Sequence, residues 1–478
     1  MINLLDLLPE YVLHWMVQKG KERRLEKEEA LLKEGEKNLS LYIVLDGLFN
    51  VSSSAVPNKV LEHGAPGSVL GEVSFFTDRP ATATVIAGEP SLVLELPKAI
   101  LRDKLDHDHG YAADLYKALL ISVSDRLRDT GVKLYAAEGV GAQDLLRDPT
   151  VRKAQEGIDA FKVLMVQLDK EAIKNGSTSE EGYQRLFGES ARLMRLCHEV
   201  LGSTSPLSDV VKQQIGSRLQ HEMLPYVLTT ETADRFYSKP RGYAGDYLAI
   251  HRIYQNEAGG TGRIGPLVDR MFLETPPSKA VRNRRALLAG EIVATVKGKP
   301  ERPVKVLCMA SGPATEVFDA FAVLEDKGRL KATLMDIDLQ ALAFVDEVRT
   351  RRKLHNQVTL VNENLIALYL GRGKTTVEPQ DLIYSIGLID YLNDKLVNKL
   401  LQYVYENLVP GGRVILGNFH PQNPAKEFMD YVLEWNLIHR TEEDMDRLFL
   451  NSAFKRKSSR FQFEKEGVNL FAECVKEQ

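Results

Sequence analysis

Residues suited to holding a nucleoside follow three predicted strands in the second half of the chain. The stretch VLCMASGPATEV places a turn after the first strand, and within it Gly312 is the position where a side chain would occupy ligand volume. Ala310 lies in the same turn. Asp336, in LMDIDLQAL, follows the second strand, where a carboxylate can accept hydrogen bonds from two ribose hydroxyls. Asn364, which closes VTLVNEN, is placed to reach a purine base.

Three more residues complete this candidate cofactor site. Ser385 and Gly387 follow the fourth strand, in DLIYSIGLIDYL, and Asp338 follows Asp336, where it can instead cap a helix. The first turn lacks the G-x-G-x-x-G pattern, which disfavours a dinucleotide dehydrogenase. The ordered set, over roughly residues 300 to 420, resembles class I S-adenosylmethionine-dependent methyltransferases. The resemblance implies S-adenosylmethionine as the cofactor.

Aromatic, basic and acidic residues alternate with glycines just upstream, in RFYSKPRGYAGDYLAIHRIY. Such a mixture is typical of a segment that lines a ligand. We expect Tyr237, Arg241, Tyr243, Asp246 and Tyr247 at the mouth of the cofactor site, with Tyr237 touching the cofactor. The alternative is a solvated loop that an Arg241–Asp246 ion pair holds in place.

The phrases KPRGYAGDY, VRNRR and GNFHPQNP resemble bacterial methyltransferases that make a 3-hydroxypalmitic acid methyl ester signal. This resemblance covers about residues 235 to 478 and implies a fatty acid-like, carboxylic acceptor. A carboxylate needs alignment and desolvation, and a guanidinium clamp suits it, so Arg241, Arg282 and Arg284 are candidate clamps. We place Arg241 and Tyr243 among the catalytic residues. A hydroxyl or amine acceptor would need a base, for which His420 is the candidate, unless it is a surface loop histidine.

Near the N-terminus, GSVLGEVSFFTDRPATATV resembles the phosphate-binding cassette of cyclic-nucleotide-binding domains. Gly71, Glu72 and Pro80 match that cassette, but Ala81 stands where the family has the arginine that pairs with the cyclic phosphate. Arg79 and Thr82 are the remaining candidates for holding an effector. The resemblance leaves three roles open: a degenerate scaffold or dimerisation module, a sensor of another nucleotide-like ligand, and an ordinary cyclic-nucleotide sensor.

Periodicity predicts three parts of the chain that position these residues. Short strands with glycine turns, followed by an amphipathic helix with Leu115, Leu119, Val123 and Leu127 on one face, predict a β-barrel or jelly-roll domain at 1–135. Helical patterns predict a connector at 136–234. Alternating strands and helices predict a doubly wound α/β sheet within a methyltransferase domain at 235–478.

Composition limits the classes of function. The 478 residues, of which 44% are hydrophobic and 27% charged, carry a net charge of -4, so no global positive field favours nucleic acid. No basic recognition helix follows the sensor, and no stretch is long and apolar enough to span a membrane. Three cysteines without paired spacing, and no signal peptide, favour a cytoplasmic protein without a metal site.

We therefore expect a methyltransferase for a small acidic or lipid-like acceptor, under control of its N-terminal domain. A homodimer could form through the amphipathic helix. Two alternatives stay open: a ligand-sensing interaction protein that keeps the fold without turnover, and an O- or N-methyltransferase for another small molecule.

Overall fold

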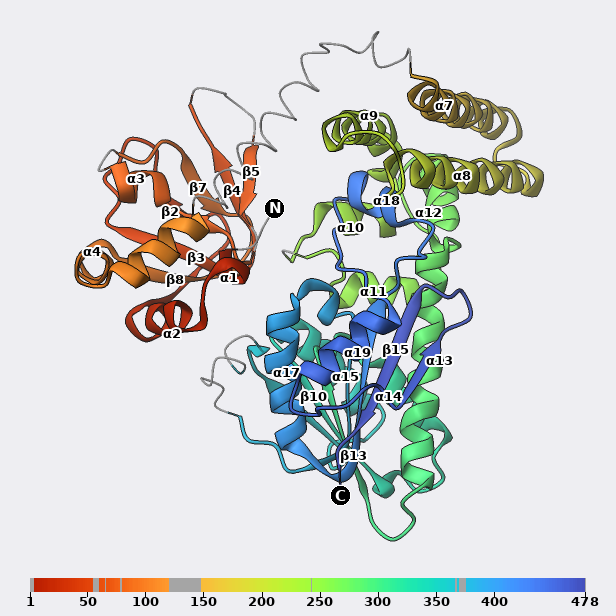
Figure 1. The fold of residues 1–478 in the computed structure, drawn as a ribbon. Helices are drawn as coiled ribbons and strands as arrows, with labels where there is room; N and C mark the ends of the chain where they lie inside the picture. Colours follow the sequence, from red (N-terminus) through yellow and green to blue (C-terminus); the bar gives the residue numbers. More distant parts are fainter. Residues whose placement is uncertain are drawn as a thin grey trace. The chain divides into compact units, whose positions relative to one another are not determined.

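The computed structural model describes residues 4–54, 60–64, 66–77, 80–119, 148–241, 243–365, 368 and 375–477. The chain forms two compact units, whose ribbon is drawn in Figure 1. The first unit comprises Met1–Val140 with Ser238–Ala244, and the second comprises Gly141–Tyr237 with Gly245–Gln478. Most of the stretch expected to be a connector therefore folds in one unit with the α/β sheet.

Two four-stranded antiparallel sheets, with orders β1-β8-β3-β6 and β2-β7-β4-β5, make up the body of the first unit. Their strands are β1 (Lys21–Leu25), β2 (Ala30–Leu32), β3 (Ser40–Asp46), β4 (Phe49–Ser52), β5 (Val60–Gly64), β6 (Val69–Leu70), β7 (Thr84–Ala87) and β8 (Ser91–Pro97). Left-handed Gly47, with φ of 89°, turns the chain between β3 and β4. The predicted all-β arrangement is confirmed.

Helices cover one of these sheets. They are α1 (Leu4–Leu7), α2 (Glu10–Lys19), α3 (Glu72–Thr77) and α4 (Lys98–His107), followed by helical residues 109–119. Val12 and Leu115 pack with Leu94 of β8 in one apolar cluster. The predicted amphipathic face is thus confirmed at Leu115 and Leu119, whereas Val123 and Leu127 lie outside the described residues.

The second unit begins with a helical layer. Its helices are α7 (Pro149–Asn175), α8 (Glu180–Leu201), α9 (Asp209–Val227), α10 (Thr232–Ser238), α11 (Tyr247–Gln255), α12 (Gly265–Leu273) and α13 (Pro276–Lys297). Asp148, Ser179 and Ser208 cap the first three by accepting a hydrogen bond from a backbone N–H. Figure 1 shows α8 beside α12 and beside α18 (Lys426–Tyr431), which comes from the other end of the domain.

A seven-stranded sheet of order β11-β10-β9-β12-β13-β15-β14 forms the rest of the second unit. Its strands are β9 (Val304–Met309), β10 (Leu330–Asp336), β11 (Val358–Asn362), β12 (Gln380–Ile386), β13 (Leu408–Phe419), β14 (Arg460–Phe463) and β15 (Asn469–Val475). The first five are parallel, and β15 pairs antiparallel to both β13 and β14. All five predicted strands are confirmed, and the antiparallel pair adds to them.

Helices cover both faces of this sheet. They include α14 (Thr315–Val323), α15 (Leu339–Arg351), α17 (Asp394–Asn407) and α19 (Glu442–Asn451), with 3-10 turns at Lys327–Arg329 and Ile389–Tyr391. One apolar cluster joins α13, α14 and α15 to the sheet, and a second joins α17 and α19 to it. This is the doubly wound, class I methyltransferase fold that the sequence predicts. Within the described residues, no helix is long and apolar enough to cross a membrane.

Candidate functional site

The turn between β9 and α14 has an uncommon backbone. Ala310, Gly312 and Ala314 are all left-handed, with φ of 53°, 51° and 47°. Left-handed alanines cost of order 1–3 kcal/mol each, and such strain gathers at ligand sites. No atom lies within 4 Å of the place where a Cβ on Gly312 would stand. The turn therefore faces open space at the residue that the sequence singled out. The buried Ser311 hydroxyl beside it has no hydrogen-bond partner among the described residues.

Asp336 at the end of β10 is joined to this turn. Its Oδ2 accepts a hydrogen bond from the backbone N–H of Gly312 at 2.8 Å, and its Oδ1 accepts one from Asp338 at 2.9 Å. Burial raises the pKa of the Asp336 carboxyl to about 6. Asp338 caps α15 by accepting a hydrogen bond from Gln340. Asp336 is thus the carboxylate that borders the open turn, and Asp338 fills the structural role that the sequence offered as its alternative.

The chain after β11 carries two amide side chains. Asn364, the predicted base contact, is half-buried two residues beyond the end of the strand, and its backbone N–H donates to Glu363. The Asn362 amide donates to the backbone oxygens of Asp336 and Ile337 at 3.1 and 2.8 Å. Asn362 therefore holds the end of β10 in place, a role that the sequence did not indicate.

The end of β12 lies beside that of β9. The fully buried hydroxyl of Ser385 donates to the backbone oxygen of Met309 at 2.9 Å. Gly387 follows in a left-handed conformation, with φ of 82°. A Cβ on Gly387 would stand 3.6 Å from Nη1 of Arg284 and 3.8 Å from Oδ2 of Asp390. Two buried side chains of opposite charge therefore lie close to this glycine.

Arg284 and Arg282 differ sharply although both lie on α13. Arg282 donates to the backbone oxygen of Leu273 and to the Glu274 carboxylate at 2.7 and 3.2 Å. Arg284 is 6% exposed, its Nε has no hydrogen-bond partner, and it forms no ion pair with any described residue. A buried guanidinium without a counter-ion is costly, so Arg284 is the stronger candidate for holding an anionic ligand group.

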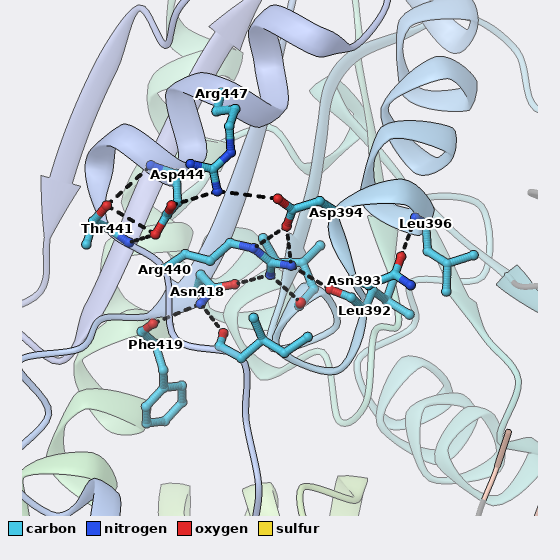
Figure 2. Close-up of polar contacts among 12 residues, drawn as sticks. Leu392, Asn393, Asp394, Leu396, Asn418, Phe419, Arg440, Thr441, Asp444 and Arg447 are labelled. Carbon is cyan, nitrogen blue, oxygen red and sulfur yellow. Dashed lines mark hydrogen bonds and ion pairs between the residues drawn. The ribbon is translucent and has the colours of Figure 1, made fainter. Parts of the chain in front are cut away.

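A second buried arginine fixes the turn that carries Asp390. The Arg440 guanidinium donates to the backbone oxygen of Leu392 at 2.6 Å and pairs with Asp394 at 3.0 Å (Figure 2). It also donates to the backbone oxygen of Ile389 at 2.7 Å and to Asn418 at the end of β13. All donors of Arg440 are thus used inside the protein. Its role is to hold Ile389–Tyr391 against β13.

In the first unit, the structure describes most of the candidate effector residues. Gly71 is left-handed, with φ of 82°, and Glu72 is buried at the start of α3, whereas Thr82 is exposed. Ala81 is buried, and its backbone forms hydrogen bonds with Glu36 and Gly35. Arg79 lies outside the described residues.

Comparison with known proteins now assigns both units. Residues 241–466 match the sequence profile of the family described as "Putative methyltransferase". The second half of the chain is a methyltransferase domain. Residues 22–108 match the profile of the cyclic nucleotide-binding domain. Neither profile is specific to 3-hydroxypalmitic acid methyl ester synthases, so that narrower resemblance stays a prediction. No curated protein matches the chain.

Several solved structures are similar to parts of the chain. "A possible exported protein" from Bordetella parapertussis is 18% identical, covering 62% of this chain and 97% of its own, with a TM-score of 0.44. Magnesium protoporphyrin IX methyltransferase from Synechocystis with bound SAM is 13% identical, covering 51% and 94%, with a TM-score of 0.33. A cyclic nucleotide-binding domain from Methylobacillus flagellatus is 21% identical, covering 25% and 68%, with a TM-score of 0.24. At these TM-scores the structures assign no ligand to this chain.

His420 of the methyltransferase domain is buried just after β13. Its Nε2 lies 3.2 Å from a carboxylate oxygen of Glu442, and its Nδ1 accepts a hydrogen bond from the backbone N–H of Gln422 at 3.3 Å. Both ring nitrogens are therefore engaged within the protein. Because a general base needs a free nitrogen toward its substrate, this geometry favours an acceptor that needs no base.

The segment before the sheet divides between the two units. Tyr237, Asp246 and Tyr247 belong to the second unit, whereas Arg241 and Tyr243 fall in Ser238–Ala244, which groups with the first. Asp246 is fully buried, caps α11 and pairs with Arg235 at 2.9 Å, an ion pair that the sequence did not indicate. Tyr247 packs on Phe344. The place of Arg241 and Tyr243 at the site's mouth remains a prediction.

Proposed function

We propose that the methyltransferase domain transfers the methyl group of S-adenosylmethionine to the carboxylate of a lipid-like acid, which yields a methyl ester. The observation that carries this proposal is the open space in front of Gly312, bordered by the Asp336 carboxylate. A nucleoside needs such a close approach to the backbone, together with an acceptor for its ribose hydroxyls.

The described residues fit this donor. Asp336 keeps lone pairs for two ribose hydroxyls beyond the two backbone hydrogen bonds that it accepts. The buried hydroxyl of Ser311, which has no hydrogen-bond partner among the described residues, is free to bind the donor, and Asn364 is the proposed contact for the adenine. When bound, S-adenosylmethionine supplies a methyl group that its positively charged sulfur makes electrophilic.

Methyl ester formation requires no proton transfer by the protein. A carboxylate oxygen forms the new bond to the methyl carbon while the carbon–sulfur bond breaks, and the sulfur keeps the electron pair and becomes neutral. No proton moves, which agrees with the engagement of both nitrogens of His420. The residues act by aligning the two reactants and excluding water.

Two small apolar cavities adjoin one another beside the helical layer, with volumes of about 10 and 30 Å³, and neither is large enough for a hydrocarbon chain. They share Met194, Phe272 and Phe428 in their linings, and most of their other lining residues are apolar. Trp435 lines one of them and donates to the hydroxyl of Tyr391 at 2.8 Å. Because Tyr391 follows Asp390, the cavities lie next to the turn beyond β12.

Arg241 and Tyr243 are the proposed contacts for the acid group, since Arg282 is already paired with Glu274. The cyclic nucleotide-binding domain is the proposed regulator of the reaction.

The test is methyl transfer by the full chain. The protein is incubated with S-adenosylmethionine labelled in its methyl group and with carboxylic acids of increasing chain length. We expect label in products that release methanol in alkali, because esters do so whereas ethers and methylamines do not. The matched substrates are alcohols of the same chain length, and the matched protein is Asp336→Ala. Donor binding without methylated product, from acids or cell extract, would favour the non-catalytic alternative.

A further inference from the structure

Two buried charged residues near the end of β12, Arg284 and Asp390, have no role in the methyl transfer described above. The Arg284 guanidinium and the Asp390 carboxylate both lie close to Gly387, 3.6 and 3.8 Å from the place where a Cβ would stand. They are 6% and 1% exposed. Within the described chain they form no ion pair with each other or with any other residue. Opposite charges held apart in a buried site are suited to a ligand that carries both charges itself.

The surroundings leave these groups available. Asp390 uses Oδ1 to accept a hydrogen bond from the backbone N–H of Phe419 at 2.8 Å, so Oδ2 faces Gly387. The Arg284 guanidinium donates a hydrogen bond to the Tyr254 hydroxyl, which leaves its charge unpaired, and it lies near Glu316, whose carboxyl accepts a hydrogen bond from Tyr384 at 2.8 Å. Burial raises the pKa of Glu316, which weakens it as a counter-ion.

The position of the pair relative to Asp336 identifies the ligand group. β10 and β12 are the two neighbours of β9, so their ends lie about two strand spacings, or about 10 Å, apart. A donor whose ribose is held at Asp336 extends across the open turn at Gly312 toward β12. The part of S-adenosylmethionine beyond its sulfur is an α-amino acid, which carries one carboxylate and one ammonium group.

We propose that Arg284 and Asp390 bind the two charges of this amino-acid head, Arg284 its carboxylate and Asp390 its ammonium group. This inference rests on the proposed donor. Gly387 is required because its backbone is left-handed, with φ of 82°, and because a side chain there would contact both charged groups. Arg440 has a positioning role, because its hydrogen bonds to Leu392 (Figure 2) and to Ile389 hold the turn that carries Asp390.

The experiment compares two ligands by calorimetry with the full chain. S-adenosylhomocysteine contains the amino-acid head, and 5′-methylthioadenosine lacks it but keeps the nucleoside and the sulfur. In the wild type we expect the first to bind more tightly. Arg284→Met and Asp390→Asn should each weaken S-adenosylhomocysteine by about 10- to 100-fold and leave 5′-methylthioadenosine unchanged. The matched control is Arg285→Met, because Arg285 neighbours Arg284 on α13 but is paired with Asp319 at 2.6 Å.

Other results of these titrations distinguish a head-group contact from a general effect on the site. Equal loss of both ligands in the variants would overturn the inference, since the residues would then shape the site as a whole. Unchanged affinity for both would overturn it too, and a raised KM for the acid acceptor would then assign Arg284 to that substrate. If a variant does not fold, equal affinity of the wild type for the two ligands still overturns the inference. If the wild type binds neither ligand, the proposed donor itself is wrong.

Discussion

The Asp336 carboxylate accepts a 2.8 Å hydrogen bond from the backbone N–H of Gly312. This hydrogen bond connects the end of β10 to the left-handed turn after β9. The Asp336 side chain therefore holds the turn in place and also provides a negative charge to the donor site. Loss of Asp336 therefore has two effects, on the ligand and on the turn, and a conservative variant separates them.

Asp336→Ala should weaken binding of S-adenosylhomocysteine by about 1–3 kcal/mol, because two ribose hydroxyls lose a charged acceptor in a buried site. Asp336→Asn keeps an oxygen that can accept from Gly312, so its thermal midpoint should stay closer to that of the wild type. Calorimetry and thermal unfolding of both variants check this. An unchanged dissociation constant in Asp336→Ala would place the ribose contact elsewhere.

Donor binding should be lost in mild acid. Burial raises the pKa of Asp336 and that of Asp390 to about 6, and both proposed roles need the ionised carboxylate. The charged group that faces Asp336 is Asp338, and those that face Asp390 are Arg284 and Arg440. Affinity is then full above the pKa and falls as the pH drops through it, by about tenfold per unit for each required deprotonation. Calorimetric titrations with S-adenosylhomocysteine between about pH 5 and about pH 8 measure this, and a constant affinity contradicts it.

Cyclic AMP should bind the first unit weakly. Ala81 replaces a guanidinium opposite the phosphate, and a charge-assisted hydrogen bond is worth about 1.5–3 kcal/mol. Ala81→Arg should raise the affinity for cyclic AMP but not for 5′-AMP, and an unchanged affinity in a folded variant would contradict this assignment of the phosphate site. Tight binding by the wild type would show that another cation serves the phosphate, with Arg79 the first to test.

Arg241→Ala and Tyr243→Phe should lower methyl transfer more than they lower stability. A lid or acceptor contact contributes most in the reacting complex, whereas a structural contact contributes to folding itself. Turnover and thermal midpoint are measured side by side with the wild type, and Arg285→Met serves as a control. Losses of activity and stability in proportion would make the segment structural.

The strands of the sheet were predictable because buried parallel strands are continuous apolar runs that end in glycine or a polar residue, as VKVLCMA does. Gly312, Asp336 and Gly387 were predicted as site residues because they lie at or just after the ends of these strands. β14 and β15 were not predicted, since RFQF and NLFAECV form an antiparallel hairpin after α19, without the helical crossover that separates the other strands.

The charged part of the site was harder to predict. Arg282, Arg284 and Arg285 stand in one helical run, and only the packing of α13 shows which guanidinium is buried without a counter-ion. Asp390 follows a strand as an ordinary polar residue, and its contact with the space at Gly387 depends on a 3-10 turn. Ala310 was expected in the turn, but the left-handed backbone that it shares with Ala314 could not be predicted, because alanine rarely adopts that conformation.

The most direct test of the donor site titrates S-adenosylhomocysteine into the wild type, Gly312→Leu and Gly411→Leu. Both glycines are left-handed, with φ of 51° and 73°, and both have open space where a Cβ would stand, so the backbone strain is matched. Only Gly312 borders Asp336. We predict that the wild type and Gly411→Leu bind alike and that Gly312→Leu loses at least about tenfold in affinity, or 1.4 kcal/mol. Equal binding by the two variants, or no binding by the wild type, would contradict the account.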